Sequence, residues 1–293
     1  MRLLLWLYIL LCHGAAALAP IGWAPNNYER LQSLLDRPVS VGRPPVAAFD
    51  ADGTLWSGDA YGAFASVLAA RGLIDYDEMR RVEEAYGRSQ GEERRQYLLE
   101  SLALFRGLRL EQLHDAAEEA WGAGLRDTLR PEMADLVRGL RDRGWRVVIV
   151  TASPAEAVLR GARELGVPEG DVLALRLDNE GGVATGLPSP VMPLTWSDGK
   201  ARALVAHGLG ERLRLAAGNS MDDMPMIRLC RAVGGEGMLC VPRPTAAEDP
   251  WTGAAEGTLR LTNVAAAEEL LLHEATSGPK EYDELSKVRS LKI

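Results

Sequence analysis

The sequence predicts an α/β protein with a doubly wound, mainly parallel sheet into which a helical cap is inserted. Two observations predict this fold class. Short apolar runs bounded by turn residues recur from residue 46 onwards, and helical patterns separate most of them, as is typical of right-handed βαβ units. The stretch 58–129 breaks this alternation with Ala-, Leu-, Glu- and Arg-rich sequence. We therefore expect a core formed by 20–57 and 130–275, a cap formed by 58–129, and a charged tail at 276–293.

The apolar runs mark the strands of the core. They lie at 46–49, 146–150, 172–175, 213–217 and 238–241. Strands that are covered on both faces are apolar throughout, which is the pattern seen here. Helical patterns are expected at 26–35, 131–143, 154–165, 199–207 and 224–231. Beyond residue 242 the patterns are weaker and predict an edge strand at 259–261 and a helix at 265–273.

Glycines divide the inserted stretch into three or four helices. The expected breaks lie near Gly72, at 87–91 and near Gly107. A second local signal lies in the core, where Gly181 and Gly182 separate two extended segments within 176–193. This arrangement predicts a β-hairpin.

The first nineteen residues have the layout of a secretory signal peptide. Arg2 precedes the apolar run 3–11, and Ala17-Leu18-Ala19 offers a small-x-small cleavage site. The apolar run is short for a bilayer span, so we favour a cleaved signal over an uncleaved anchor. The protein is therefore expected to be periplasmic or secreted, without stable membrane insertion after cleavage. Cys230 and Cys240 would then remain, and we interpret both as small buried residues rather than as a disulfide framework.

Composition limits the class of partner. The chain carries 33 Lys and Arg against 41 Asp and Glu, a formal net charge of −8, with both signs mixed along its length. Nucleic acid is disfavoured as the main partner, because a phosphate backbone requires a basic face. A small phosphorylated metabolite remains compatible with this charge, since a local basic pocket suffices to bind it.

Carboxylates follow the first core strand. Asp50 and Asp52 come directly after 46–49, and Gly53 allows the chain to bend there. Ligand sites of doubly wound sheets lie at the carboxyl ends of the strands, which favours a functional role over a simple polar turn.

Thr151 ends the second strand, and Ser153, Pro154 and Glu156 resemble an N-cap, N1 and N3 of a capping box. A helix beginning there would direct free backbone N–H groups at an anion.

Two further signals follow later strands or begin helices. Lys200 lies at the start of a predicted helix, and the strand 213–217 runs into Gly218, Asn219 and the acidic pair Asp222 and Asp223. Carboxylate oxygens are the ligands that Mg²⁺ prefers. Each signal alone is weak, but their order along the chain predicts one site for an anion and a hard cation.

With these four motifs the sequence resembles the haloacid dehalogenase (HAD) superfamily. They are FDADGT at Asp50, VTAS at Thr151, Lys200, and GNSMDDMPM at Gly218, and the helical insert resembles the type 1 cap of the phosphoserine-phosphatase-like branch. The resemblance implies a magnesium-dependent phosphatase. Asp50 would be the nucleophile that forms an aspartyl-phosphate, and Asp52 would be the general acid and base. Thr151, Ala152 and Lys200 would hold the phosphoryl group, and Asp50, Asp52, Asn219 and Asp223 would hold Mg²⁺.

The fourth motif departs from the family pattern, which usually has aspartate where this chain has Asn219. An amide oxygen can ligate Mg²⁺ but brings no negative charge, so we expect a lower metal affinity. Asn219 thus gives some support to a degenerate, non-catalytic phosphate-binding protein, although Asp50, Asp52, Thr151 and Lys200 are all present. A phosphotransferase would share every motif, whereas a dehalogenase would need neither Asp52 nor magnesium.

The identity of the phosphomonoester is expected to depend on the cap. Its charged candidates are Glu83, Glu84, Arg88, Arg94 and Arg95, most of which we interpret as solvated helix faces. Trp56, Tyr61 and Trp121 would form an aromatic wall for a cationic head group such as choline. Core packing is the favoured interpretation for at least two of these three.

Overall fold

The computed structural model describes residues 25–39, 42–241 and 260–263. The predicted signal segment 1–19, the predicted helix 265–273 and the tail 276–293 lie outside these residues. None of the helices within the described part combines the length and the apolar character that crossing a bilayer requires.

Within the described part, six strands form one sheet in the order β3-β2-β1-β6-β7-β8. Five are parallel: β1 (Val46–Phe49), β2 (Arg146–Pro154), β3 (Val172–Leu175), β6 (Leu213–Gly218) and β7 (Glu236–Val241). The short strand β8 (Arg260–Asn263) pairs antiparallel with β7 at the edge. The chain moves from the central β1 to β2 and β3, then crosses to β6 and β7 on the other side. The predicted doubly wound, mainly parallel α/β core is confirmed.

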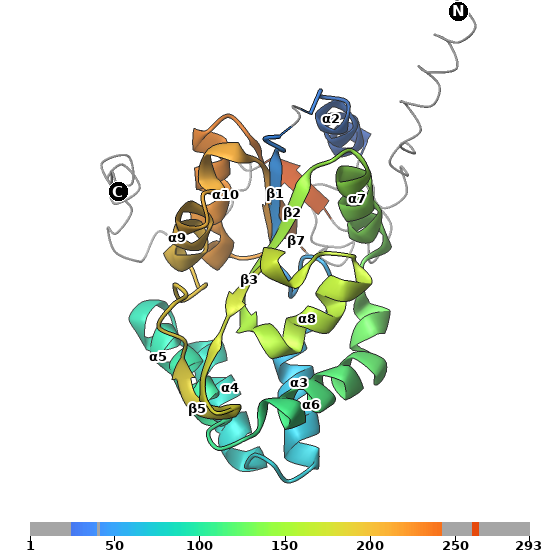
Figure 1. Cartoon of the computed structure of the whole chain (residues 1–293). Coiled ribbons are helices and arrows are strands. Elements are labelled where there is room, and N and C mark those ends of the chain that lie inside the picture. Colours follow the sequence, from blue (N-terminus) through green and yellow to red (C-terminus); the bar gives the residue numbers. More distant parts are fainter. Residues whose placement is uncertain (1–24, 40–41, 242–259, 264–293) are drawn as a thin grey trace, which may run out of the picture.

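Helices cover both faces of this sheet (Figure 1). One face is covered by α9 (Asp198–Ala206) and α10 (Met224–Ala232), and the other by α2 (Pro25–Leu35), α7 (Pro131–Asp142) and α8 (Ala155–Glu164). Alternate residues of β1 therefore face two different cores, Val46 and Ala48 on one side and Ala47 and Phe49 on the other. Burial on both faces explains why the strand sequences are apolar throughout.

The inserted stretch forms a helical cap at the carboxyl ends of the strands (Figure 1). It consists of α3 (Ala60–Ala70), α4 (Tyr76–Arg88), α5 (Gly91–Ala103), α6 (Leu110–Gly122) and the 3₁₀ turn η1 (Leu125–Thr128). Asp59 and Asp75 start α3 and α4 as N-caps, accepting hydrogen bonds from the backbone N–H of Gly62 (3.1 Å) and Glu78 (2.8 Å). The segments that enter and leave the cap lie side by side, since the Ser57 N–H donates to the Thr128 carbonyl (2.8 Å).

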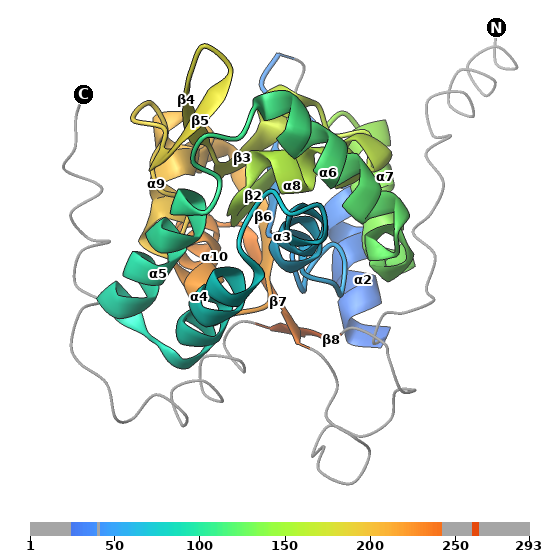
Figure 2. The ribbon, with the colours of Figure 1, turned by 90° about the horizontal axis from the view of Figure 1, so that it is seen from below.

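The predicted hairpin is present as β4 (Leu177–Glu180) and β5 (Val183–Pro188), with Gly181 and Gly182 at positive φ in the turn. It leaves the core after β3 and lies against the cap beside α5, as the view from below shows (Figure 2). Ala184 exchanges backbone hydrogen bonds with the loop between α5 and α6, through Gly107 and Leu108 (2.8 Å each). The hairpin is thus a second connection between core and cap.

The two cysteines of the described part, Cys230 and Cys240, are both buried and free. Their interpretation as small buried residues is confirmed.

Candidate active site

The candidate site lies where β1, β2 and β6 end. Phe49 is in register with Ile149 on one side and Ala217 on the other, so the residues that follow these strands meet at one edge of the sheet. The backbone N–H of Asp50 donates to the Ala217 carbonyl (2.8 Å), which continues the pairing to the first carboxylate. The sheet thereby brings together Asp50, Thr151 and Asn219, as the sequence predicts.

Asp50 is 5% exposed and is held from two sides. Lys200 Nζ contacts one carboxylate oxygen, Oδ1, at 2.6 Å, and the hydroxyl of Thr54 donates to the other, Oδ2, at 3.2 Å. Burial and the neighbouring Asp223 raise the pKa of Asp50, whereas Lys200 opposes that rise. For Lys200, burial disfavours the charge, but the attraction of Asp223 and Asp50 outweighs it and the pKa is raised. Lys200 therefore remains a cation beside the carboxylate.

Asp52 accepts hydrogen bonds at both of its oxygens. Trp56 Nε1 (2.6 Å) and the backbone N–H of Ala60 (2.7 Å) donate to Oδ1, and the Ser153 hydroxyl donates to Oδ2. Burial and the charge of Asp59 raise the pKa of Asp52 to about 6, although the hydrogen bonds act in the opposite direction. A fixed carboxyl that titrates near neutral pH suits transfer of a proton in either direction.

Asp223 is completely buried behind these groups. Its Oδ2 accepts hydrogen bonds at 2.9 Å from the backbone N–H groups of Asn219 and Ser220 and from the Ser220 hydroxyl, and its Oδ1 contacts Lys200. Gly218 leaves the room for this, because a Cβ there would lie 2.2 Å from the Cβ of Asp223. The structure thus places Asp223 where it fixes Lys200 and the loop that carries Asn219.

The amide of Asn219 lies beside the two oxygens that would face a metal. Oriented with its nitrogen inwards, it donates to the Asp52 carbonyl (3.0 Å) and to Asp50 Oδ2 (3.1 Å). Gly53, at φ +77°, bends the chain so that the amide packs against it. Among the described residues no group of three His, Cys, Asp or Glu side chains is spaced for a metal ion. A carboxylate, a main-chain carbonyl and an amide oxygen nevertheless fit Mg²⁺, which accepts few protein ligands and keeps several waters.

Six of the seven predicted site residues line one cavity of about 560 Å³: Asp50, Asp52, Thr151, Ala152, Lys200 and Asn219. The seventh, Asp223, lies behind it. The opposite wall comes from the cap and includes Tyr61, Glu83, Tyr86 and Arg94. A small phosphorylated molecule would therefore be enclosed between the core and the cap.

The predicted capping box at the end of β2 is wrong. Helix α8 begins at Ala155 with Pro154 as its N-cap, and no side chain caps it. Strand β2 continues to Pro154, which pairs with Leu175, and the Ser153 hydroxyl binds Asp52 instead of the helix end. The two functions compete for one hydroxyl, and the bond to the buried carboxylate is the one that forms. Sequence reasoning thus missed the contacts of Ser153 and Trp56 with Asp52. It also missed the contact of Thr54 with Asp50, although Thr54 belongs to the FDADGT motif.

The aromatic residues of the predicted wall separate into two groups. Trp56 and Trp121 are buried in the core, edge to face with ring centroids 5.7 Å apart. Only Tyr61 of the three lines the cavity. The favoured interpretation, that at least two of them pack in the core, is confirmed.

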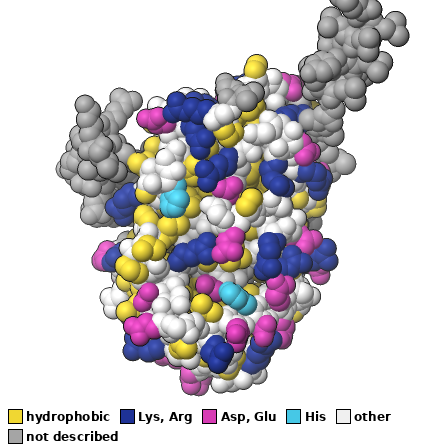
Figure 3. Space-filling view, in the orientation of Figure 1, with side chains coloured by type: hydrophobic (Ala, Val, Ile, Leu, Met, Phe, Trp, Pro, Cys, Tyr) yellow, Lys and Arg dark blue, Asp and Glu magenta, His cyan; other side chains and the backbone are white. Residues whose placement is uncertain are grey.

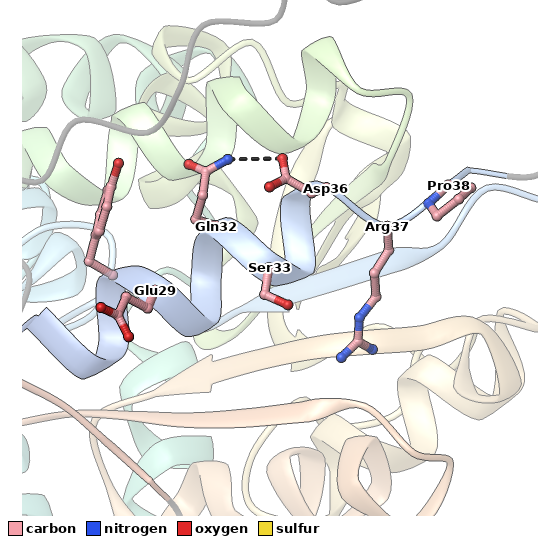
Figure 4. Close-up of a pocket in the computed structure, with 7 residues that line it drawn as sticks. Glu29, Gln32, Ser33, Asp36, Arg37 and Pro38 are labelled. Atoms are coloured by element: carbon pink, nitrogen blue, oxygen red, sulfur yellow. Dashed lines mark hydrogen bonds between the residues drawn. The ribbon is translucent and has the colours of Figure 1, made fainter.

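A second hollow, on the outer surface of α2, is separate from this site (Figure 4). It is lined by Tyr28, Glu29, Gln32, Ser33, Asp36, Arg37 and Pro38, none of which belongs to the predicted site. Gln32 Nε2 donates to Asp36 Oδ1 across its edge (2.9 Å). Side chains of both charges are mixed on the face that Figure 3 shows.

Comparison with known proteins identifies the family. The model of the haloacid dehalogenase-like hydrolase family matches residues 47–228, more than half of the chain. A Mycobacterium leprae protein named as a hydrolase is 29% identical over 230 residues, covering 71% of this chain and 75% of that protein. The phosphoserine phosphatase SerB1 of Mycobacterium tuberculosis is 28% identical over 232 residues, covering 72% and 74%.

Solved structures agree in fold. A Bordetella pertussis protein of unknown function has a TM-score of 0.54 and 26% identity, over 63% of this chain and 86% of that one. An Anaerococcus prevotii protein of unknown function has a TM-score of 0.58 at 15% identity, over 72% and 85%. With the family model and the site geometry in agreement, the chain belongs to the haloacid dehalogenase-like hydrolases.

Proposed function

We propose that this hydrolase is a magnesium-dependent phosphatase that cleaves a small phosphomonoester through an aspartyl-phosphate on Asp50. One observation carries the proposal: Asp50 lies at a cavity between core and cap, contacts the cation of Lys200, and is followed two residues later by a second, fixed carboxyl. The similarity to a phosphoserine phosphatase supports phosphoryl rather than carbon–halogen chemistry.

The first step forms the covalent intermediate. A carboxylate oxygen of Asp50 attacks phosphorus, the bond from phosphorus to the alcohol oxygen breaks, and Asp52 gives its proton to that oxygen. In the second step water attacks phosphorus, its proton goes to Asp52, and the bond to Asp50 breaks to release inorganic phosphate. Lys200 and the hydroxyl of Thr151 would hold the phosphoryl oxygens throughout.

Asp50, the main-chain carbonyl of Asp52 and the Asn219 amide oxygen are the residues that would hold Mg²⁺. When bound, the ion would neutralise negative charge on the phosphoryl group. Both carboxylate oxygens of Asp223 already accept hydrogen bonds, so we assign Asp223 to positioning Lys200 and Asn219.

Hydrolysis of an aryl phosphate by the purified protein tests the proposal. We expect phosphate release with Mg²⁺, none with excess EDTA, and recovery when Mg²⁺ is restored. Asp50→Asn should reduce turnover at least about a thousand-fold, since it removes the nucleophile. A phosphoryl group found on Asp50 by mass spectrometry after acid quenching would support the intermediate directly. Folded protein that releases no phosphate with any divalent metal would overturn the proposal in favour of a phosphate-binding protein.

We also propose export, on the layout of residues 1–19. N-terminal sequencing of protein recovered from an exporting host is expected to start at Pro20. An intact N-terminus in such a host would contradict cleavage.

A further inference from the structure

The cap side of the cavity carries two converging carboxylates. Asp59 and Glu83 both line it, and they approach Gly62 from different helices. A Cβ on Gly62 would lie 2.9 Å from Asp59 Oδ2 and 3.8 Å from Glu83 Oε1. The missing side chain lets one oxygen of each carboxylate come close to Gly62, which itself lines the cavity. Their mutual repulsion is visible in Glu83, whose pKa is raised by burial first and by Asp59 second.

Neither of these two facing oxygens has a hydrogen-bond donor within the described structure. Asp59 uses its other oxygen, Oδ1, to cap α3. Glu83 uses Oε2 to contact Arg80, at 3.3 Å on the outer side of α4. Both side chains thus have one oxygen committed to the protein and one directed to the space beside Gly62.

Aromatic side chains line the same cavity. Tyr61, Tyr86 and Tyr97 line it from the cap, and Trp196 lines it from the core. The faces of such rings attract organic cations, and quaternary ammonium groups are often bound in aromatic cages. Tyr86 already interacts in this way with an internal cation, since the Arg94 guanidinium lies 5.2 Å from its ring centroid.

The cations that line the cavity are already engaged by the protein. Arg94 donates to the Ser89 carbonyl (2.9 Å), contacts Asp222 Oδ2 (3.5 Å) and stacks on Tyr86. Lys200 lies between Asp50 and Asp223. The end of the cavity near Gly62 is therefore negative, and an anionic group on the substrate would meet carboxylates there without an unengaged cation to receive it.

We propose that the preferred substrate is the phosphate ester of a small amino or quaternary ammonium alcohol, whose cation lies beside Gly62 between Asp59 and Glu83 and against the tyrosine rings. This inference rests on the proposed phosphatase function and adds the nature of its leaving group. The phosphate occupies the end with Lys200, and the cationic end of the same molecule occupies the acidic end. A carboxylate on the alcohol would weaken binding, because it adds a negative charge beside Asp59 and Glu83.

A comparison of four phosphomonoesters tests this preference. Phosphocholine and phosphoethanolamine carry the cation alone, O-phosphoserine adds a carboxylate, and glycerol 2-phosphate carries neither charge. We expect kcat/KM for the first two to exceed that for the last two by on the order of ten-fold. Equal or higher kcat/KM for O-phosphoserine or glycerol 2-phosphate would overturn the inference while leaving the phosphatase function in place.

Charge-neutral variants then test the residues. Asp59→Asn keeps an N-cap, since asparagine caps helices as well as aspartate does, and Glu83→Gln keeps the shape of its side chain. Each should lower the ratio of kcat/KM for phosphocholine to that for glycerol 2-phosphate by about five- to ten-fold. Asp75→Asn is the matched control, because Asp75 caps α4 in the same way but does not line the cavity. An unchanged ratio in both cavity variants would contradict the assignment.

Binding provides a readout that does not depend on turnover. Titration calorimetry on Asp50→Asn should show tighter binding of phosphocholine than of glycerol 2-phosphate, and the difference should shrink in Asp50→Asn/Asp59→Asn. If the wild-type protein hydrolyses nothing, the phosphatase function fails, and this comparison still tests the cation site beside Gly62. Equal affinities for the two esters would reject it.

Discussion

Asn219 places a neutral amide where a third acid would otherwise stand beside Asp50 and Asp52. With its nitrogen inwards, the amide donates to Asp50 Oδ2 and to the Asp52 carbonyl, which are the oxygens that would face the metal. In the metal-free protein the amide thereby satisfies two acceptors that a carboxylate would repel or leave unpaired. Turning the amide over would present its oxygen to the metal instead. The same side chain would thus suit the protein with and without the metal, and we expect a lower metal affinity than with an aspartate.

In Asn219→Asp the free energy of unfolding should therefore depend more strongly on Mg²⁺ than in the wild type. In EDTA we expect a loss of about 1–3 kcal/mol in unfolding free energy, because a further, half-buried carboxylate would lie beside two others. With saturating Mg²⁺ the variant should gain more stability than the wild type does, because the added charge strengthens binding. Thermal unfolding in both conditions measures this, with Asn179→Asp on the exposed hairpin as the control. Equal melting temperatures of variant and wild type in EDTA would rule out this role for the amide.

Ser153 holds Asp52, the proposed general acid. Its hydroxyl donates to Asp52 Oδ2 and completes a set of donors with Trp56 and Ala60. In Ser153→Ala we expect kcat to fall on the order of ten-fold and KM to change little, because the proton donor is less well oriented. Ser153→Thr keeps the hydroxyl and should restore most of the rate. A raised KM with unchanged kcat would instead assign Ser153 to substrate binding.

Helix α8 joins core and cap through a close contact at Gly161. A Cβ there would lie within 3.0 Å of ring atoms of both Trp56 and Trp121, which stack edge to face. Gly161→Ala should therefore cost about 1–3 kcal/mol of unfolding free energy through overpacking, despite the better helix propensity of alanine. Urea unfolding measures the loss.

Gly87 in α4 provides the opposite case. Nothing lies within 4 Å of a Cβ built on it, so Gly87→Ala should raise the unfolding free energy by about 0.5–1 kcal/mol through helix propensity alone. If Gly161→Ala and Gly87→Ala both lowered the unfolding free energy, or if neither did, contact with the two tryptophans would not explain the effect of Gly161→Ala.

Most core elements could be predicted because their signals are local. The run 46–49 coincides with β1, and the helical insert, the hairpin and the edge strand are all present. Strand β2 is longer than the predicted 146–150 because Ser153 and Pro154 are held by Asp52 and Leu175, which are distant in sequence. The same limit applies to the site. Asp50, Thr151 and Asn219 could be predicted because each follows or ends a strand in the sequence. The groups that donate hydrogen bonds to Asp52 could not, because tertiary packing brings them together.

At the scale of the whole molecule, core and cap share one hydrophobic cluster that includes Phe49, Trp56, Phe64, Phe105 and Trp121. The hairpin adds backbone hydrogen bonds to the cap at the loop between α5 and α6. The two parts are therefore expected to unfold together, and a buried charge at their junction should influence the stability of the entire molecule. Glu156, in the first turn of α8, is such a charge.

Burial raises the pKa of Glu156 above its value of 4.5 in the unfolded chain, and the nearby Arg176 and His114 only partly oppose this, while Glu169 adds to it. Its Oε2 has no hydrogen-bond partner in the described residues. Well below pH 4.5 both states are protonated and Glu156 has no effect. As the pH rises, the unfolded state ionises first, so the native state loses stability until its own pKa is passed. Glu156→Gln should therefore be more stable than the wild type at pH 7 and similar at acid pH, as measured by urea unfolding. Glu180→Gln on the exposed hairpin makes the same charge change as a control, and a Glu156→Gln gain that is equal at both pH values would contradict the argument.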